Sequence, residues 1–286
     1  MKGDYPITWL CELLGVSRSN YYAAKKRGPS ARAREDAQLA PKIAAAHRRS
    51  RGTYGTPRIV ADLREEGERI GRKRCGRLMQ AQGIRGRKKH RRKPRTTDSR
   101  ETHAPAPNRL AQQPAPTGPN QIWVTDITCV LTAEGWLYLA AIVDLWSRRV
   151  VGWACGPTMH VSLVLTALRK ALALRRPSAG VLHHSDRGSQ YAAHEYTAAL
   201  AAAGLVPSMS RAGNCYDNAT MESFWSSCKS DTELDHLVLA TRREVELVIF
   251  DYIETFYNPT RRHSSLCQIS PVVFENLNSR KDTQAA

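Results

Sequence analysis

Two kinds of hydrophobic periodicity divide the chain near residue 120. In the first part, apolar residues recur three and four positions apart, which is the spacing of one buried helix face. This pattern predicts helices over 7–14, 18–26, 31–49, 56–66 and 72–82. Gly15 and Gly67 end two of these segments, and Ser17 is a suitable N-cap for the second helix. Short helices paired in this way are typical of helix-turn-helix units.

After Asn120 the pattern changes to short apolar runs bounded by turn residues. These runs predict strands over 122–131, 136–144, 150–154, 180–183 and 206–209. Helical spacing predicts helices over 161–174, 193–203 and 219–230. Three strands, helix, strand, helix, strand, helix is the order of the ribonuclease H-like fold. We therefore expect an α/β core with a mixed five-stranded sheet and flanking helices, preceded by an all-α helix-turn-helix DNA-binding region.

The excess of basic residues is confined to the helical part. Residues 1–100 hold 27 Lys and Arg against 9 Asp and Glu, whereas residues 101–286 hold 16 against 17. Because neutralising phosphates releases counterions, a concentrated positive charge favours double-stranded DNA or another nucleic acid as partner. A solvated charged surface is the alternative interpretation.

The predicted helix over 72–82 is the stronger candidate for a recognition helix. Its cations are Arg72, Lys73, Arg74 and Arg77. They lie beside apolar positions, which suits a helix that buries one face and presents the other to the major groove. An ordinary amphipathic surface helix is the alternative. In the basic run that follows, Arg87, Lys88 and Lys89 are further candidate contacts, lying in a minor groove or along phosphates unless the run is a solvated tether.

These changes in composition predict four parts. Residues 1–28 form an N-terminal helix-turn-helix segment, and residues 29–84 form a helical DNA-binding domain. Residues 85–119 form a basic arm and a Pro-rich linker. Residues 120–280 form the catalytic core with a C-terminal helical tail.

The remaining composition indicates where such a protein works. The seven cysteines are scattered without zinc-ligand spacing, which indicates reduced thiols. The sequence has no run of eighteen apolar residues and no apolar signal-peptide core at its N-terminus. We expect a cytoplasmic protein without a membrane partner; the family resemblance given below further implies a bacterial protein that is associated with the nucleoid when bound to DNA.

Three acidic residues suit metal-assisted phosphoryl transfer. Asp126 lies inside an apolar strand, Asp186 follows a strand, and Glu222 begins a helix after an interval of 35 residues. Mg²⁺ prefers carboxylate oxygens, and two ions roughly 3.5–4 Å apart stabilise the attacking and leaving oxygens of a phosphodiester. The sequence offers no Ser-His-Asp arrangement or Walker-type loop for this role. We expect these three residues to be both the catalytic residues and the metal ligands.

Each candidate also has a structural interpretation. Asp126 is expensive to bury unless it binds a cation or a hydrogen-bond network, and a satisfied strand-end aspartate is its alternative. Lys229 lies seven positions after Glu222 on the same helix face and is a candidate for contacting substrate phosphate, or else a solvated lysine. His183 and His184 are not assigned as ligands. Asp144 is expected to form a turn or to pair with Arg148.

The chain resembles the DDE transposase and retroviral-type integrase superfamily, and more closely the second-frame (OrfB) transposases of the insertion-sequence-3 family. The resemblance covers nearly the whole chain. Its motifs include Leu-Gly-Val-Ser-Arg-Ser-Asn-Tyr-Tyr at 14–22, Arg-Gly-Thr-Tyr-Gly-Thr-Pro-Arg at 51–58, Gly-Arg-Lys-Arg at 71–74, Trp-Val-Thr-Asp-Ile-Thr at 123–128, His-Ser-Asp-Arg-Gly-Ser-Gln-Tyr at 184–191, Asp-Asn-Ala-Thr-Met-Glu-Ser-Phe-Trp at 217–225 and Tyr-Asn-Pro-Thr-Arg-Arg-His-Ser-Ser-Leu at 257–266.

The resemblance implies a DNA transposase of a bacterial insertion sequence with an integrase catalytic core. It implies that Asp126, Asp186 and Glu222 bind two Mg²⁺ ions, with Mn²⁺ as a substitute, and that Lys229 contacts DNA. It also implies nicking at the element's ends, attack by the exposed 3′-hydroxyl, and a circular intermediate. Its expected partners are the terminal repeats and target DNA, further copies of the chain on DNA, and an upstream-frame (OrfA) product or fusion.

Two other functions suit parts of the same pattern. One is a DNA-binding regulator that keeps the helix-turn-helix units and performs no chemistry. The other is a nuclease of the same fold that cleaves RNA–DNA hybrids. The paired helix-turn-helix patterns favour duplex DNA, because an α-helix fits the B-form major groove and not the deep, narrow groove of an A-form helix.

Overall fold

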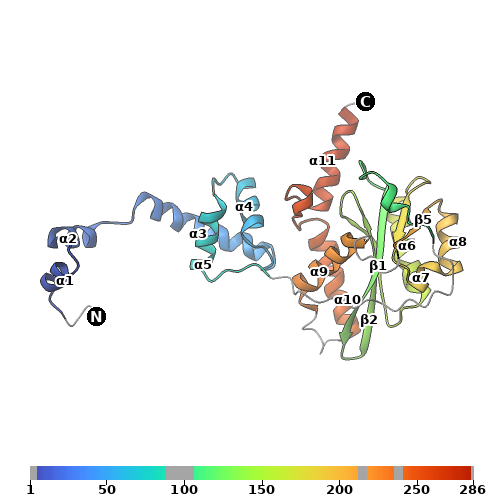
Figure 1. Ribbon diagram of the computed structural model, residues 1–286, viewed down its shortest axis with the longest axis horizontal. Helices are drawn as coiled ribbons and strands as arrows, with labels where there is room; N and C mark the ends of the chain where they lie inside the picture. The colour runs from blue at the N-terminus through green and yellow to red at the C-terminus, as the bar shows by residue number, and fades with distance from the viewer. Residues whose placement is uncertain (1–4, 88–105, 212–217, 235–240, 285–286) are drawn as a thin grey trace. The chain divides into compact units, whose positions relative to one another are not determined.

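The computed structural model describes residues 5–87, 106–211, 218–234 and 241–284 (Figure 1). It divides into two compact units, Met1–Arg85 and Gly86–Ala286. No helix in the described ranges has the length and apolarity needed to cross a membrane. Their cysteines are all free thiols.

The first unit is entirely helical, as the sequence predicts. Its helices are α1 (Ile7–Leu13), α2 (Arg18–Lys26), α3 (Ala31–Arg49), α4 (Thr56–Glu65) and α5 (Arg72–Ala81). The hydroxyl oxygens of Ser17 and Ser30 accept hydrogen bonds from the first turns of α2 and α3, each at 3.1 Å. Apolar residues of α3, α4 and α5 form the core, including the fully buried Ile43, Ile59 and Leu63.

The second unit is built on a mixed five-stranded sheet in the order β3-β2-β1-β4-β5. Its strands are β1 (Ile122–Thr132), β2 (Gly135–Asp144), β3 (Val150–Gly156), β4 (Leu182–Ser185) and β5 (Val206–Met209). The first three form an antiparallel meander, whereas β4 pairs in parallel with β1 and β5 in parallel with β4. The expected ribonuclease H-like arrangement is thereby confirmed.

Helices cover both faces of this sheet (Figure 1). On one face lie α6 (Val161–Arg175), α7 (Ser189–Ala192) and α8 (His194–Ala202), and on the other lie α9 (Ala219–Thr232), α10 (Arg242–Phe250) and α11 (Pro271–Gln284). A π-helical segment, Asp251–Tyr257, follows α10. The core beneath α6 and α8 includes Trp123, Ile142 and Leu168. Gly152 is required there, because a Cβ at this position would lie 2.3 Å from the Ala167 carbonyl oxygen of α6.

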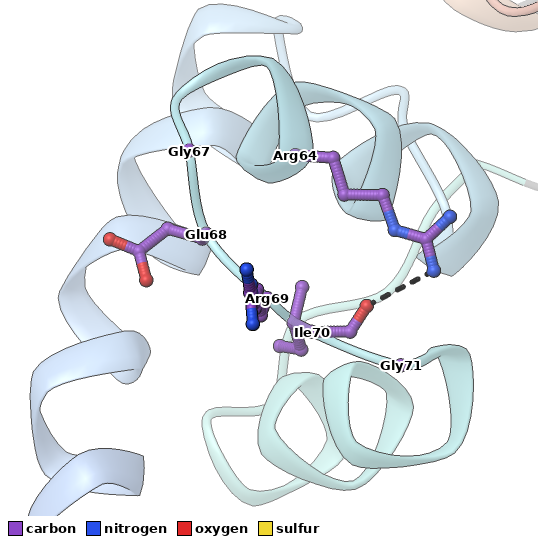
Figure 2. Close-up of a pocket in the computed structure, with 6 residues that line it drawn as sticks. All are labelled: Arg64, Gly67, Glu68, Arg69, Ile70 and Gly71. Carbon is purple, nitrogen blue, oxygen red and sulfur yellow. Dashed lines mark hydrogen bonds between the residues drawn. The ribbon is translucent and has the colours of Figure 1, made fainter.

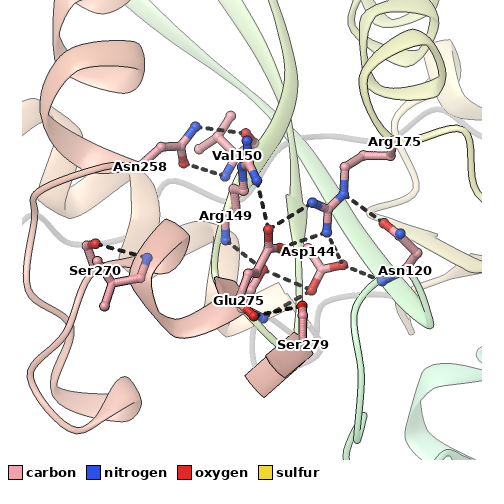
Figure 3. A network of polar contacts seen from close by, with 11 residues as sticks. Asn120, Asp144, Arg149, Val150, Arg175, Asn258, Ser270, Glu275 and Ser279 are labelled. Atoms are coloured by element: carbon pink, nitrogen blue, oxygen red, sulfur yellow. Dashed lines mark hydrogen bonds and ion pairs between the residues drawn. The ribbon is translucent and has the colours of Figure 1, made fainter. Parts of the chain in front are cut away.

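A buried ion-pair network fastens α11 to the sheet (Figure 3). Glu275 of α11 accepts hydrogen bonds from Arg149 Nη1 at 2.8 Å and from both terminal nitrogens of Arg175 at 2.9 and 2.7 Å. Burial raises the pKa of Glu275, but the hydrogen bonds from Arg175 and Arg149 outweigh it and hold the pKa below its ordinary value. The ionised form of this carboxylate is therefore favoured over the protonated form to a lower pH than for an ordinary glutamate.

Asp144 joins the same network at the end of β2 and is fully buried. Its carboxylate accepts hydrogen bonds from backbone nitrogens of the following turn, as the sequence predicts, with Trp146 N and Ser147 N each at 3.0 Å. The turn is the alternative that the structure shows, closed by Arg148 N donating to the Asp144 carbonyl at 2.8 Å, and Arg175 forms an ion pair with the Asp144 carboxylate at 3.6 Å. The side chain of Arg148 instead donates to Thr220 of α9.

We predict that Glu275→Gln destabilises the second unit by roughly 3–5 kcal/mol, because it leaves two partly buried arginines without their anion. In the wild type, the stabilisation by ionised Glu275 should be lost as the pH falls through the lowered pKa of this residue. The free energy of unfolding of Glu275→Gln should not show this additional fall at acid pH. Urea unfolding followed by tryptophan fluorescence between pH 3 and 7 measures both.

Glu246→Gln is the matched control, because Glu246 forms an exposed pair with Arg243 at 3.0 Å. Such pairs contribute about 0.5 kcal/mol or less. Equal losses in the two variants would contradict a structural role for the Glu275 network.

Candidate active site and nucleic-acid interface

The parallel register of β1 and β4 brings Asp126 and Asp186 to the same edge of the sheet. Val124 pairs with His184, and each aspartate lies two residues further along its own chain. Parallel strands advance together at about 3.3 Å per residue, and residues two apart share a face. β4 ends at Ser185, so the two carboxylates lie where β1 continues beyond its neighbour.

Burial and mutual repulsion make this pair of carboxylates unfavourable as two free anions. Burial, followed by the charge of Asp186 and more weakly that of Glu222, raises the pKa of Asp126 to about 7. Burial also raises the pKa of Asp186, although Gly188 N donates to its Oδ1 at 3.0 Å and lowers it in part. A divalent cation bound between them would offset both the burial of these charges and their mutual repulsion.

The third carboxylate, Glu222, projects from the first turn of α9 and is exposed. Its helix is fixed against β1 on the same edge, because Trp225 Nε1 donates to Asp126 Oδ2 at 3.0 Å. Glu222 lies one turn before Trp225 on the same helix face. Nevertheless, the described ranges contain no assembled group of three or more His, Cys, Asp or Glu side chains able to hold a metal ion.

The donor set fits a hard divalent cation. Asp126 and Asp186 supply carboxylate oxygens, which Mg²⁺ prefers, and a site held by two protein carboxylates is completed by water and substrate phosphate. The neighbouring histidines do not compete for this role: His183 Nε2 contacts Tyr196 Oη at 2.8 Å, and His184 Nδ1 contacts Ser208 Oγ at 2.9 Å. Burial lowers the pKa of His183 to about 3, so it is neutral.

Two contacts of α9 with β1 were not predicted from sequence. The indole of Trp225 and the side-chain amide of Asn218 both reach β1, where Asn218 Nδ2 donates to the Thr125 carbonyl at 3.2 Å. The available signal was their spacing, because Asn218 and Trp225 lie four residues before and three residues after Glu222. Lys229, predicted to contact DNA, here donates from Nζ to the Cys129 carbonyl at 3.0 Å.

The cations of α5 divide into two groups. Arg74 donates from Nε to Asp36 Oδ1 at 2.7 Å and from Nη2 to Glu35 Oε2 at 2.9 Å, and Arg77 also pairs with Asp36. These ion pairs hold α5 on α3, a structural role that the sequence did not predict, and the predicted DNA contacts of Arg74 and Arg77 stay predictions. Arg72 and Lys73 are exposed and take part in no ion pair within the described part of the chain.

Figure 2 shows the turn between α4 and α5, where Arg64 and residues 67–71 line a cavity of about 570 Å³. Arg64 crosses this turn and donates from Nη2 to the Ile70 carbonyl at 3.4 Å. Gly71 is the N-cap of α5 and provides no side-chain acceptor for the helix's first N–H groups. Arg72 and Lys73 follow it directly, so positive charge and unpaired N–H groups coincide at this helix end.

The basic arm is described only at its start. Arg87 donates to the Asp231 carbonyl and lies 3.5 Å from Glu233 Oε1, so it contacts the end of α9. Lys88 and Lys89 lie outside the described residues.

Comparison with protein families agrees with this division into helical and catalytic parts. Residues 33–93 match a family described as an HTH-like domain. Residues 116–215 and 203–271 match two families, both described as an integrase core domain.

Among solved structures, the catalytic core of the HTLV-2 integrase in complex with magnesium, trimeric form, is 17% identical, with a TM-score of 0.44, and the match covers 56% of this chain and 98% of that one. The simian T-cell lymphotropic virus intasome in complex with PP2A regulatory subunit B56 gamma is 15% identical, with a TM-score of 0.48, and the match covers 82% of this chain and 74% of that one.

Curated relatives match almost end to end. The chain is 48% identical over 266 residues to the insertion element IS600 uncharacterized 31 kDa protein of Shigella sonnei, covering 93% of this chain and 97% of that protein. It is 38% identical over 281 residues to the transposase InsF for insertion sequence IS3A of Escherichia coli (strain K12), covering 97% and 96%. The chain therefore belongs to the insertion-sequence-3 family of transposases, DDE-type polynucleotidyl transferases with an HTH-like domain and an integrase core.

Proposed function

We propose that Asp126, Asp186 and Glu222 are the catalytic residues and that they bind two Mg²⁺ ions, for which Mn²⁺ can substitute. With them the protein cleaves DNA at the ends of its insertion sequence and joins the resulting 3′-hydroxyl to target DNA. The observation that carries this proposal is the convergence of two partly buried carboxylates, Asp126 inside β1 and Asp186 just after the end of the adjacent parallel strand β4, with the pKa of Asp126 raised to about 7. An uncompensated pair of this kind suits a site that takes up cations.

In this mechanism the protein supplies position and the metal ions supply charge. Ile127 N and Trp225 Nε1 donate to the two oxygens of Asp126, at 2.8 and 3.0 Å, and fix the rotation of its carboxylate. Bound ions would activate the attacking oxygen and stabilise the leaving oxygen. In strand transfer, a bond forms between the 3′-hydroxyl oxygen and a target phosphorus, and the bond from that phosphorus to the target's own 3′ oxygen breaks.

The remaining parts of the chain would place DNA in this site. Residues 29–84 bind the element's terminal repeats through Arg72 and Lys73 of α5, while residues 1–28 add a second helix-turn-helix segment. Residues 85–119 join these parts to the catalytic core over 120–280. Because two element ends must be held together, we infer a homo-oligomer on DNA, with an upstream-frame product as a further partner.

We predict that Asp126→Asn, Asp186→Asn and Glu222→Gln each reduce Mg²⁺-dependent strand transfer by at least a hundredfold, because each removes a charged metal ligand. The assay follows a labelled oligonucleotide that carries an element end with a free 3′-hydroxyl. DNA affinity, measured by fluorescence anisotropy, should stay within about twofold of the wild type.

Glu195→Gln is the matched control for Glu222→Gln, because both glutamates are exposed in the first turn of a helix. Its activity should equal that of the wild type. Full activity in any carboxylate variant would remove that residue from the proposed triad. DNA binding without strand transfer by the wild type, even with the upstream-frame product added, would favour a regulator.

Metal-free stability should reveal the raised pKa of Asp126. Because its folded pKa of about 7 exceeds the unfolded value of 3.8, the native state binds the extra proton between these values, and stability falls as pH rises through this window. We predict that the wild type in EDTA loses up to about 1.4 kcal/mol per pH unit from this group between pH 5 and 7. Asp126→Asn should lose that slope.

Urea unfolding of the second unit at several pH values measures this slope. Adding Mg²⁺ to the wild type should reduce it, because a bound cation favours the ionised carboxylate. Identical slopes for the wild type and Asp126→Asn would show that Asp126 titrates normally.

The two groups of α5 cations should respond differently to substitution. Replacing Arg72 and Lys73 by alanine should weaken binding to duplex DNA and lower the slope of log affinity against log salt by about 2, with an unchanged unfolding temperature. Arg74→Ala should instead lower the unfolding temperature of the first unit, since it breaks the ion pairs with Asp36 and Glu35. An unaltered salt slope for the double variant would exclude this end of α5 from the interface.

A further inference from the structure

Three side chains attach α9 to the part of β1 that extends beyond β4. The contacts are Asn218 Nδ2 to Thr125 O at 3.2 Å, Trp225 Nε1 to Asp126 Oδ2 at 3.0 Å, and Lys229 Nζ to Cys129 O at 3.0 Å. The three donors are seven and four residues apart, so they lie on one helix face. Their acceptors advance along β1 in the same order, and α9 therefore runs along β1 in the same direction.

The lengths of the two elements agree with this alignment. The eleven residue steps of helix from Asn218 to Lys229 span roughly 16 Å, and the four residue steps of strand from Thr125 to Cys129 span roughly 13 Å. Glu222 lies on the same face, four residues after Asn218 and three before Trp225. We call Asn218, Glu222, Trp225 and Lys229 the α9 stripe. Within it, Glu222 is held between the contacts to Thr125 and to Asp126.

The side chain of Asn218 contacts β1 and does not cap its own helix. Asn218 is the N-cap residue of α9, where an asparagine oxygen normally accepts a hydrogen bond from the first helical turn, yet it makes no such bond. Its Oδ1 is buried and has no hydrogen-bond partner in the described ranges. Leaving a buried acceptor unpaired is unfavourable, because the atom loses its hydrogen bonds to water and gains none in the protein. This position is therefore suited to holding β1 rather than to stabilising the helix.

Trp225 fixes the carboxylate itself. Its side chain is buried, with only 6% of its surface exposed, and its single polar atom is directed to Asp126 Oδ2. The other oxygen, Oδ1, accepts from Ile127 N at 2.8 Å. Each carboxylate oxygen retains further lone-pair capacity, so an oriented Asp126 can still bind a ligand. Groups that orient a ligating carboxylate in this way tune metal affinity in many proteins.

We propose that Asn218 and Trp225 are positioning residues of the transposase: by fastening the α9 stripe to β1 they set the place of Glu222 relative to Asp126. This inference rests on the proposed function of the two carboxylates. It requires that removing the side-chain donor of Asn218 or Trp225 weakens metal binding and slows turnover, while the stability of the fold changes much less.

The test compares Trp225→Phe with Trp153→Phe in the full chain. Both substitutions keep an aromatic ring and remove one indole-to-carboxylate hydrogen bond, since Trp153 Nε1 donates to Glu254 Oε1 at 2.8 Å away from the site. We expect Trp225→Phe to weaken Mn²⁺ binding, measured by electron paramagnetic resonance, by roughly tenfold or more. Strand-transfer turnover should fall with an unchanged KM for DNA, whereas Trp153→Phe should change neither.

Asn218→Ser separates positioning from helix stability, because serine is a good N-cap but is too short to replace the amide. We expect an unfolding temperature within a few degrees of the wild type together with reduced Mn²⁺ affinity and turnover. Equal Mn²⁺ affinity in Trp225→Phe and Trp153→Phe would overturn the inference while leaving the proposed function intact. Unchanged Mn²⁺ binding in Asp126→Asn would overturn both.

Discussion

The catalytic edge depends on one constraint: β1 is longer than its neighbour β4, and the backbone groups exposed by this difference need partners. Alternate residues of β1 turn their N–H and C=O groups towards the side where β4 has ended. Asn218 and Lys229 of α9 fill two of these positions, at Thr125 O and Cys129 O, and the carboxylate of Asp126 accepts from Ile127 N. The overhang thus attaches a helix and orients the carboxylate of Asp126 at once.

Two acidic clusters of this unit, one buried around Glu275 and one partly buried around Asp126, have opposite electrostatics. Glu275 contacts two arginines, and hydrogen bonds to them hold its pKa below the ordinary value despite burial. Asp126 and Asp186 meet at the other cluster, where burial raises the pKa of both, and the hydrogen bonds from Ile127 N, Trp225 Nε1 and Gly188 N lower these pKa values only in part. The same type of side chain therefore stabilises the fold in one place and remains uncompensated in the other. The uncompensated pair lies on the same edge as Glu222, and this is where the proposed mechanism places the divalent cations.

Sequence periodicity was sufficient to predict all five strands and the helices α1 to α6, α8 and α9 to within a few residues, because each of these elements has a clearly apolar face or run, but it gave no ranges for α7, α10 or α11. It also placed Asp126 and Asp186 at strand positions that the parallel register brings level. It did not reveal that Arg74 pairs with residues 38 and 39 positions away, or that Lys229 contacts a β1 carbonyl, since no local pattern encodes such contacts. The π-helical segment after α10, Asp251–Tyr257, was also missed.

The central claim is that the α9 stripe holds Glu222 where it can share metal ions with Asp126 and Asp186. The most direct test is anomalous diffraction from crystals of the full chain soaked in Mn²⁺, recorded near the manganese absorption edge. The account predicts anomalous density bound by the carboxylates of Asp126 and Asp186, with Glu222 completing the ligand set and Trp225 still donating to Asp126. Manganese held elsewhere, or held with Trp225 released and Glu222 turned away, would contradict it.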